Sequence, residues 1–240
     1  MTAAPSATRR ERTRAATIDE IKATALDLMR GAGTVDVRFT DIARVMGVTP
    51  PALYRYFADR DELLTALITD AYDDLARHVA ASGAAAPDDL GARWEAAAQA
   101  YREWAHREPE RFALILGLPV PGYVAPEEGP TSEAASRALS QLSSLFVEAL
   151  HADTLGAPYL REVDPTVEVC AHGKSEDLEV TLPAESFQAM LHAWAALHGF
   201  TSLEAYGHLD WMEPAARDAL FGSQVTLIAR VAGLPEPLRA

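Results

Sequence analysis

The amino-acid sequence predicts an all-α protein that has a small N-terminal three-helix domain and a larger helical domain. Apolar residues recur at spacings of three and four along most of the chain, which is typical of helices with one buried face. Proline, glycine or a small polar residue stands near most expected helix ends. We count about nine helices, and a strand-like alternation occurs only within 153–183.

The expected helices follow one another from the N-terminus. Residues 1–14 are predicted to be a flexible arm, and Ile18, Ile21, Ala25 and Leu28 then form the apolar face of a first helix that ends near residues 31–33. The remaining predictions are two short helices within 40–57, a long helix from 59 to 82, and five helices near 87–104, 109–116, 132–150, 183–198 and 214–231. Residues 117–130 form a loop, and 153–183 fit either a small hairpin or an ordered loop.

The composition limits the classes to which this chain can belong. It has 240 residues, of which 49% are hydrophobic, enough for one or two domains with a sizeable core. There is no 18-residue apolar run and no secretory signal pattern, so neither a membrane span nor export is expected. The single cysteine, Cys170, cannot form an intramolecular disulfide and fits a reducing compartment. We therefore expect a cytoplasmic protein.

The charge is distributed unevenly along the chain. The whole protein has a net charge of −14, but residues 1–57 hold nine Lys and Arg against six Asp and Glu. Residues 58–240 are strongly acidic, with 12 basic and 29 acidic residues. A basic N-terminal part on an acidic remainder suits a protein that contacts DNA with one end only, because the acidic part is repelled by phosphates.

Residues 40–57 carry the pattern of a helix-turn-helix. Thr40 can cap a first short helix, and Gly47 occupies the turn, where a positive φ is needed. Thr49 can cap the second helix, and Pro50 then takes its first position, where a missing N–H costs nothing. In such a motif the second helix enters the major groove of DNA.

The end of this segment resembles the TetR family of bacterial transcriptional regulators. The resemblance is carried by Leu53-Tyr54-Arg55-Tyr56-Phe57, followed by Asp59-Arg60-Asp61-Glu62-Leu63-Leu64, and it covers about residues 15–65. Two departures occur. Pro50-Pro51 stands where many members have small or polar residues, and Arg60 stands where lysine is usual. The two prolines remove two hydrogen-bond donors from the start of the helix, and the arginine keeps the positive charge of the usual lysine.

Candidate DNA-binding residues are arginines, tyrosines and helix-capping threonines of the N-terminal part. The arm arginines could reach phosphates or the minor groove, or could be solvated. Arg44 and Arg55 could contact a guanine edge or a phosphate. The resemblance implies phosphate contacts by the two tyrosines, and the helix N-terminus places Arg60 near a phosphate. The set is Arg9, Arg10, Arg12, Thr40, Arg44, Thr49, Tyr54, Arg55, Tyr56 and Arg60.

A second run, Trp194-Ala195-Ala196-Leu197-His198-Gly199-Phe200, resembles the tryptophan-histidine-glycine class of TetR C-terminal domains. The resemblance implies a homodimer formed by the last two long helices and a ligand pocket among the middle helices. Candidate interface residues are His198, Phe221, Val225 and Ile228. Aromatic residues at helical spacing are usually core, and the candidate pocket walls are Trp94, Tyr101, Trp104, Phe112, Phe146 and Trp194.

These observations together predict a dimeric repressor that binds a pseudo-palindromic double-stranded operator and leaves it when a small-molecule effector binds. The predicted domains are residues 15–58 for DNA binding and 59–240 for ligand binding and dimerisation. We find no catalytic motif, metal-ligand spacing or cofactor motif. The alternatives are a small-molecule-binding protein or enzyme with a vestigial DNA-binding domain, and an architectural DNA binder without a ligand.

Overall fold

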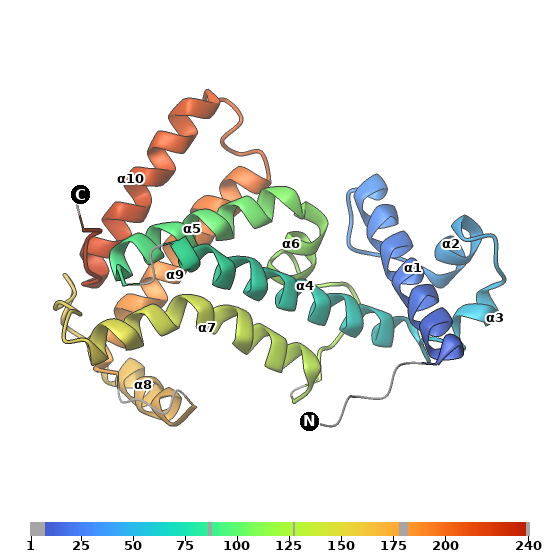
Figure 1. Ribbon diagram of the computed structural model, residues 1–240, viewed down its shortest axis with the longest axis horizontal. Coiled ribbons are helices and arrows are strands. Elements are labelled where there is room, and N and C mark those ends of the chain that lie inside the picture. Colours follow the sequence, from blue (N-terminus) through green and yellow to red (C-terminus); the bar gives the residue numbers. More distant parts are fainter. Residues whose placement is uncertain (1–7, 86–87, 127, 178–181, 239–240) are drawn as a thin grey trace. The chain divides into compact units, whose positions relative to one another are not determined.

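The computed structural model describes residues 8–85, 88–126, 128–177 and 182–238. These residues form ten α-helices and no strand (Figure 1), which confirms the all-α class. The helices are α1 (Arg9–Ala32), α2 (Phe39–Val45), α3 (Pro50–Leu53), α4 (Arg60–Ser82), α5 (Leu90–Arg107), α6 (Pro109–Leu116), α7 (Pro130–His151), α8 (Pro165–Asp177), α9 (Ala184–Ala205) and α10 (Pro214–Ala232). A 3₁₀ turn, Gly83–Ala85, follows α4. No helix in the described ranges is long and apolar enough to cross a membrane.

The first helix is longer than the sequence predicts. Residues 9–14, expected to belong to a flexible arm, form the first turns of α1. Thr8 and Glu11 form a capping box, in which the Thr8 hydroxyl accepts from the Glu11 N–H at 3.3 Å and the Glu11 carboxylate accepts from the Thr8 N–H at 2.6 Å. These bonds satisfy two N–H groups at the helix start, so the basic residues extend a helix.

The helix-turn-helix has the predicted turn and a shifted first helix. Helix α2 begins at Phe39 with Arg38 as its N-cap, so Thr40 lies in the first turn and does not cap it. Gly47 has a φ of +67°, as the turn requires. Thr49 is the N-cap residue of α3 and Pro50 its first helical residue, although the Thr49 side chain makes no capping hydrogen bond.

The expectation of a hairpin or a loop over 153–183 is wrong for Pro165–Asp177, which form α8, whereas residues 154–164 form a loop. The alternation of Val167 and Val169 suggested a strand, yet the helix start is specified nearby. Asp164 accepts hydrogen bonds from the Thr166 N–H at 2.9 Å and from the Thr166 hydroxyl at 2.6 Å. These bonds lower the pKa of the Asp164 carboxyl, and Pro165 follows at the first helical position. Residues 178–181 lie outside the described ranges.

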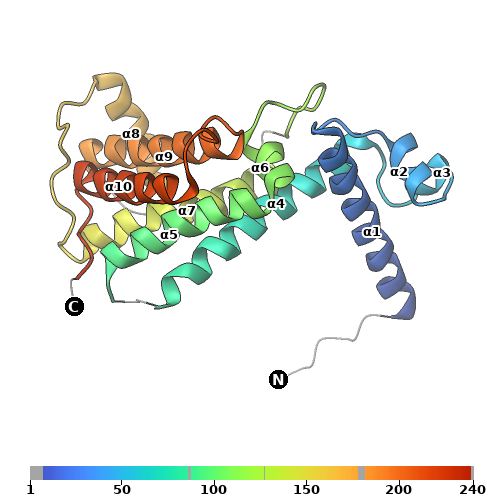
Figure 2. The same cartoon turned by 90° about the horizontal axis from the view of Figure 1, so that it is seen from above.

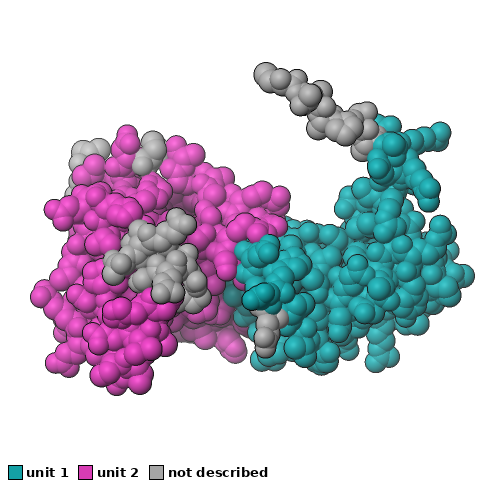
Figure 3. Space-filling view, turned by 90° about the horizontal axis from the view of Figure 1, so that it is seen from below, with its two compact units in different colours: residues 1–72, 108–134 teal, residues 73–107, 135–240 magenta. Residues whose placement is uncertain are grey.

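The chain divides into two compact units (Figure 3). Unit 1 comprises residues 1–72 and 108–134, and unit 2 comprises 73–107 and 135–240. Helix α6 and the loop after it therefore belong to the unit that contains the helix-turn-helix. The domain boundary between residues 58 and 59 stays a prediction from sequence.

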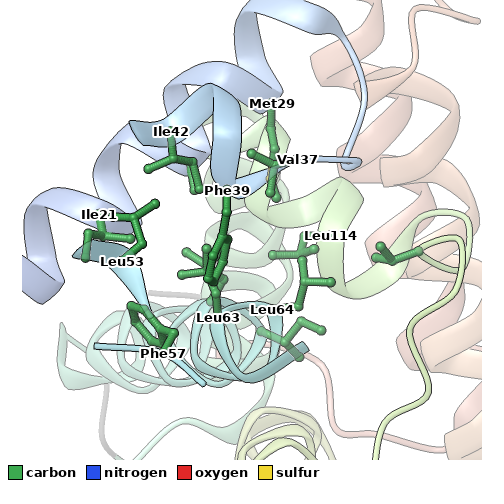
Figure 4. Packing of buried hydrophobic residues seen from close by; sticks show 14 of the residues in the cluster. Ile21, Met29, Val37, Phe39, Ile42, Leu53, Phe57, Leu63, Leu64 and Leu114 are labelled. Atoms are coloured by element: carbon green, nitrogen blue, oxygen red, sulfur yellow. The ribbon is translucent and has the colours of Figure 1, made fainter. Parts of the chain in front are cut away.

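The core of unit 1 holds the helix-turn-helix together. Buried side chains from five helices and the loops beside them point toward one another (Figure 4), with Leu53 from α3 and Leu114 from α6 among them. Phe57, which follows the two tyrosines, is 5% exposed and belongs to this core. The labelled members are Ile21, Met29, Val37, Phe39, Ile42, Leu53, Phe57, Leu63, Leu64 and Leu114.

Unit 2 is built on the packing of α5, α9 and α10, and α9 and α10 lie side by side (Figure 2). The buried face of α10 carries Phe221, Val225 and Ile228. The Phe221 ring lies 5.3 Å from that of Phe200 on α9, and the Val225 carbonyl accepts a hydrogen bond from the Trp94 indole of α5 at 3.2 Å. This face of α10 is therefore part of the core of a single chain.

A buried ion pair joins α5 to α9. The Arg102 guanidinium donates to both Glu204 oxygens at 2.6 and 2.5 Å, and it also lies 2.8 Å from the Asp218 carboxylate of α10. Burial raises the pKa of the Glu204 carboxyl, but the hydrogen bonds and charge of Arg102 outweigh burial and hold the pKa below its usual value. Glu204 is consequently ionised at neutral pH, and the pair fixes the two helices in register.

Two glycines, Gly156 and Gly233, contact each other at the C-terminal end of α10. Gly233, the C-cap residue of α10, has a φ of +82°, and its carbonyl accepts a hydrogen bond from the Gly156 N–H at 2.7 Å. A Cβ atom on Gly233 would lie 2.2 Å from the Gly156 carbonyl oxygen. Residue 233 is therefore restricted to glycine both by its backbone angles and by the approach of a second backbone.

We predict opposite stability effects for two glycine-to-alanine changes in unit 1. Neither Gly47 nor Gly31 would place a Cβ within 4 Å of another group, so only backbone conformation differs. Gly47→Ala should lower the free energy of unfolding by about 1–2 kcal/mol, because alanine is strained at positive φ. Gly31→Ala should raise it by about 0.5–1 kcal/mol, because Gly31 lies inside α1. Urea denaturation measures both, and a neutral Gly47→Ala variant would contradict the assigned turn.

Candidate nucleic-acid interface and ligand pocket

At the end of the helix-turn-helix, exposed polar side chains lie between two buried apolar residues. Leu53 and Phe57 are 1% and 5% exposed, whereas Tyr54 is 56% exposed and Arg55 is also at the surface. Helix α3 ends at Leu53, so the tyrosines predicted on the recognition helix lie in the turns that follow it. Hydrogen bonds from the Tyr56 and Phe57 N–H groups to the Leu53 carbonyl, at 2.9 and 3.1 Å, continue the helical path.

Tyr54 and Tyr56 take different neighbours, as their spacing predicts. The Tyr54 ring lies 5.1 Å from the ring of buried Phe39, and the rings are tilted by 55°. Tyr56 is half-buried, and the Arg14 guanidinium lies 5.2 Å above its ring. Both phenols are thus held by packing on unit 1, which orients them without burying Tyr54.

Helix α1 brings its arginines to the same surface. Arg14 donates a hydrogen bond to the Arg55 carbonyl at 3.0 Å, so the N-terminal turns of α1 lie against the segment after α3. Arg14 is one of the arm arginines for which the sequence predicts a phosphate or minor-groove contact, whereas Thr13 was not among the predicted site residues. One concave surface is lined by Arg9, Arg10, Thr13, Arg14, Arg55 and Tyr56.

The other predicted contacts lie at the surface of the same unit. Arg12, Thr40 and Thr49 are exposed, and Thr40 lies in the first turn of α2, whose N–H groups have no carbonyl partner within the helix. Exposed Arg44 pairs with Asp41 one turn earlier. The structure therefore places each of these side chains where a large polyanion could approach.

Arg60 has a structural role that the sequence did not indicate. It is half-buried and donates to the Asp36 carboxylate at 2.7 Å and to the Val37 carbonyl at 3.1 Å. A third, longer bond reaches the Pro121 carbonyl at 3.4 Å. With these partners Arg60 joins the start of α4 to the segment before α2 and to the loop after α6.

Unit 2 contains a largely apolar pocket with a volume of about 510 Å³. Helices α5, α7 and α9 line it, and the polar residues of the lining are three serines and two tryptophans. The lining residues are Trp94, Ser136, Leu139, Ser140, Leu142, Ser143, Phe146, Phe187, Met190, Leu191, Ala193 and Trp194. Pockets of this size and composition are typical of small-molecule sites.

Half of the predicted pocket residues line this cavity. Trp94, Phe146 and Trp194 do, and the Trp94 and Phe146 rings meet edge to face with centroids 6.4 Å apart. The other predicted walls lie elsewhere. Tyr101 donates or accepts a hydrogen bond with His198 at 2.9 Å, and the fully buried Trp104 donates to Asp74 at 2.9 Å. Phe112 belongs to α6 in unit 1 and is also fully buried.

His198, predicted at a dimer interface, lies directly behind the pocket wall. Its ring stacks on that of Trp194 with an interplanar angle of 4° and a centroid distance of 5.4 Å. Its Nδ1 atom lies 2.9 Å from the Tyr101 hydroxyl, and its Nε2 atom lies 3.3 Å from the Ser202 hydroxyl. Burial lowers the pKa of His198, so the ring is neutral at pH 7.

The other predicted interface residues, Phe221, Val225 and Ile228, face the core of their own chain and are 2%, 3% and 6% exposed. Their side chains already pack within their own chain, so a dimer through them stays a prediction from sequence. Another side of α10 instead exposes three large apolar side chains, and α9 exposes two. They are Leu220, Leu227 and Val231 of α10 and Leu191 and Leu203 of α9.

The described part of the chain is thus a helix-turn-helix protein of the DNA-binding class, with a second helical unit that contains a small-molecule pocket. Comparison with protein families agrees. Residues 21–67 match the model of bacterial regulatory proteins of the tetR family, and residues 94–228 match the tetracyclin repressor-like C-terminal domain. The protein belongs to the TetR family and is a DNA-binding transcriptional regulator.

Individual relatives lead to the same family. The chain is 32% identical over 210 residues to the HTH-type transcriptional regulator Rv1816 of Mycobacterium tuberculosis, and the alignment covers 83% of this chain and 85% of Rv1816. Among solved structures, the regulatory protein SCO4313 is 32% identical with a TM-score of 0.71, over 92% of this chain and 98% of that one. A Rhodococcus sp. RHA1 protein of unknown function shares the fold at 23% identity, with a TM-score of 0.66 over 89% and 93% of the two chains.

We predict that Tyr54→Ala weakens DNA binding about tenfold or more, because a tyrosine hydroxyl on a phosphate is a hydrogen bond to a charged group. Its exposure should keep the loss of stability near 1 kcal/mol, mainly from the Phe39 contact. Fluorescence anisotropy gives the affinity and thermal denaturation the stability. Tyr159→Ala is the matched control, since Tyr159 is 86% exposed in unit 2. If Tyr54→Ala leaves the affinity for DNA unchanged, Tyr54 does not contact DNA.

Proposed function

We propose that the protein is a homodimeric repressor that binds a pseudo-palindromic operator and releases it when a small molecule occupies the pocket of unit 2. The observation that carries the release step is this pocket, because an architectural DNA binder has no need for a cavity of about 510 Å³ between three helices. Ligand-controlled release is also typical of the TetR family to which the chain belongs.

The operator contacts are proposed from exposure and charge. Arg9, Arg10 and Arg12 on the first turns of α1 would bind phosphates or the adjacent minor groove. Arg55 and Tyr54 would face the major groove at the end of α3, and Arg44, Thr40, Thr49 and Tyr56 would contact the phosphates beside it. In this proposal Arg60 positions α4 and contributes its positive charge to the phosphate field, since its hydrogen bonds are already made within unit 1.

The dimer is proposed to form through the exposed face of α10 together with α9. Leu220, Leu227 and Val231 recur at spacings of seven and four, so they lie on one side of α10. Leu203 lies on the exposed side of the neighbouring helix α9. Two copies related by a two-fold axis would bury these side chains against each other and place two helix-turn-helix motifs about 34–36 Å apart.

Helix α4 is the element through which the ligand would act. Its first part, to Tyr72, belongs to the unit of the helix-turn-helix, and Asp73–Ser82 belong to the unit of the pocket. A ligand that displaces this helix would change the spacing of the two DNA-binding motifs. A coupling of about 1–3 kcal/mol would weaken operator binding about 5–150-fold.

The test of this function is fluorescence anisotropy on DNA from upstream of the protein's own gene, with random competitor DNA at two salt concentrations. Saturable, competitor-resistant binding that weakens steeply with salt is expected, because phosphates are neutralised by arginines. Weak binding with the same affinity for the upstream DNA and the random DNA would contradict specific recognition of the upstream DNA. A molecule that binds unit 2 and leaves operator affinity unchanged would contradict ligand-controlled release.

We predict that Leu227→Glu disrupts the dimer. Leu227 is 55% exposed, and a two-fold axis would place the new charge in the interface twice, so dimer affinity should fall about 100-fold or more. Light scattering after size-exclusion chromatography measures the assembly, and operator affinity should fall with it. Leu118→Glu is the control, because Leu118 is 86% exposed in the loop after α6. A dimeric Leu227→Glu protein would place the interface elsewhere.

A further inference from the structure

We propose that the pocket of unit 2 binds an uncharged aromatic molecule that bears a hydrogen-bond acceptor, and that the indole N–H of Trp194 is the donor. This inference deepens the proposed function, because it assigns the chemistry of the effector. Nothing in the family assignment specifies that chemistry.

The walls of the pocket select for an apolar, aromatic ligand. Trp94, Phe146, Phe187 and Trp194 supply four aromatic side chains, and Met190 adds a polarisable thioether. Aromatic rings prefer offset or edge-to-face contact with other rings, and the edge-to-face pair of Trp94 and Phe146 already has this geometry. A planar ring system would therefore contact several walls at once.

The absence of charge in the lining excludes an ionised ligand from the interior of the pocket. Among the described residues that line it, none carries a charged side chain. An ion that enters an apolar site loses its hydration and gains no opposite charge in return, so its affinity falls steeply. A neutral molecule does not incur this loss.

The two indole groups of the pocket differ in one decisive respect. The Trp94 Nε1 atom donates to the Val225 carbonyl at 3.2 Å. The Trp194 Nε1 atom is buried and has no hydrogen-bond partner within the described residues. A buried donor without a partner is unfavourable, and an acceptor on the ligand would supply the missing bond.

The serine hydroxyls of α7 do not compete for this role, because Ser136 is exposed to water and the other two lining serines already donate. Ser140 donates its proton to the Arg137 carbonyl at 2.8 Å, and Ser143 donates to the Ser140 carbonyl at 3.4 Å. Their remaining lone pairs can only accept. Trp194 is therefore the donor at this wall that still needs an acceptor.

The position of the Trp194 ring is fixed before any ligand arrives. The ring stacks on His198, which is held in turn by Tyr101 and Ser202. A side chain that is already oriented loses little conformational entropy on binding. The ring that carries the unpartnered N–H group is therefore held in the pocket wall before a ligand arrives.

The test uses three probes on the full-length protein. The first is 6-propionyl-2-(dimethylamino)naphthalene, which is neutral and has a ketone. The second, 2-(dimethylamino)naphthalene, lacks the ketone, and the third, 6-(p-toluidino)naphthalene-2-sulfonate, is an anion. We expect saturable binding of the ketone probe and at least tenfold weaker binding of the sulfonate. Equal or tighter binding of the sulfonate would overturn the assignment of a neutral ligand, and no binding of either neutral probe would overturn the aromatic site.

A pair of substitutions tests the donor. Trp194→Phe keeps an aromatic wall and removes the N–H, so it should weaken the ketone probe about five- to tenfold and leave the ketone-free probe within about twofold. Trp94→Phe is the matched control, because its N–H is bound to Val225. It should affect both neutral probes equally. Equal effects of Trp194→Phe on the two neutral probes would overturn the donor role.

A second pair locates the site without changing an aromatic ring. Ser143→Asp places a charge in the pocket lining and should abolish binding of both neutral probes. Ser144→Asp, on the next position of α7 and outside the lining, should leave binding unchanged. Retained binding in Ser143→Asp would place the probes elsewhere. If the probes discriminate as expected and none alters operator affinity, the proposed release by ligand fails while the pocket chemistry stands.

Discussion

Leu53 and Phe57 insert into the core of unit 1 on either side of the residues that face solvent at the end of the helix-turn-helix. This insertion matters because α3 has four residues, far fewer than a helix needs to be stable in water on its own. Its position is set by the side chains it buries beneath α1 and α2. Tyr54 and Arg55 therefore project in a fixed direction because the residues that flank them cannot leave the core.

Unit 2 is also held by its buried contacts, and there a polar contact supplements the apolar ones. A buried ion pair such as that of Arg102 and Glu204 adds little net stability, because desolvation offsets most of the attraction. Breaking it by removing one partner would leave a buried charge, which costs far more. The pair therefore fixes the register of α5 against α9. These helices carry Trp94 and Trp194, which both line the pocket.

Local signals in the sequence were sufficient for the helix-turn-helix and insufficient for surfaces that long-range packing creates. Gly47, Pro50 and the apolar spacing around them specify a turn between two helices without reference to the rest of the chain. In the segment of α8, the alternation of Val167 and Val169 predicts a strand, whereas Asp164-Pro165 is a common helix start. The structure follows the second signal.

The pocket and interface predictions depend on tertiary geometry that the sequence does not show. Tyr101 shares the apolar stripe of α5 with Trp94 but lies seven residues, about 10 Å, further along the helix, beyond the reach of the cavity. Helix α10 is apolar on two sides, and periodicity cannot tell which side meets the helix's own chain. Phe221 turned out to face inward and Leu227 outward. The unsatisfied Trp194 donor likewise follows from tertiary packing, since its sequence context differs little from that of a core residue.

The close approach of Gly156 and Gly233 has a consequence for how this protein can vary between lineages. Any side chain at position 233 would collide with the Gly156 carbonyl, whereas Gly233 itself leaves room for the two backbones to pair. Neutral drift can therefore alter most of the surface around this point but cannot alter Gly233 alone. In diverging descendants the two positions should change together, by a shift of the segment after α7, or remain as they are.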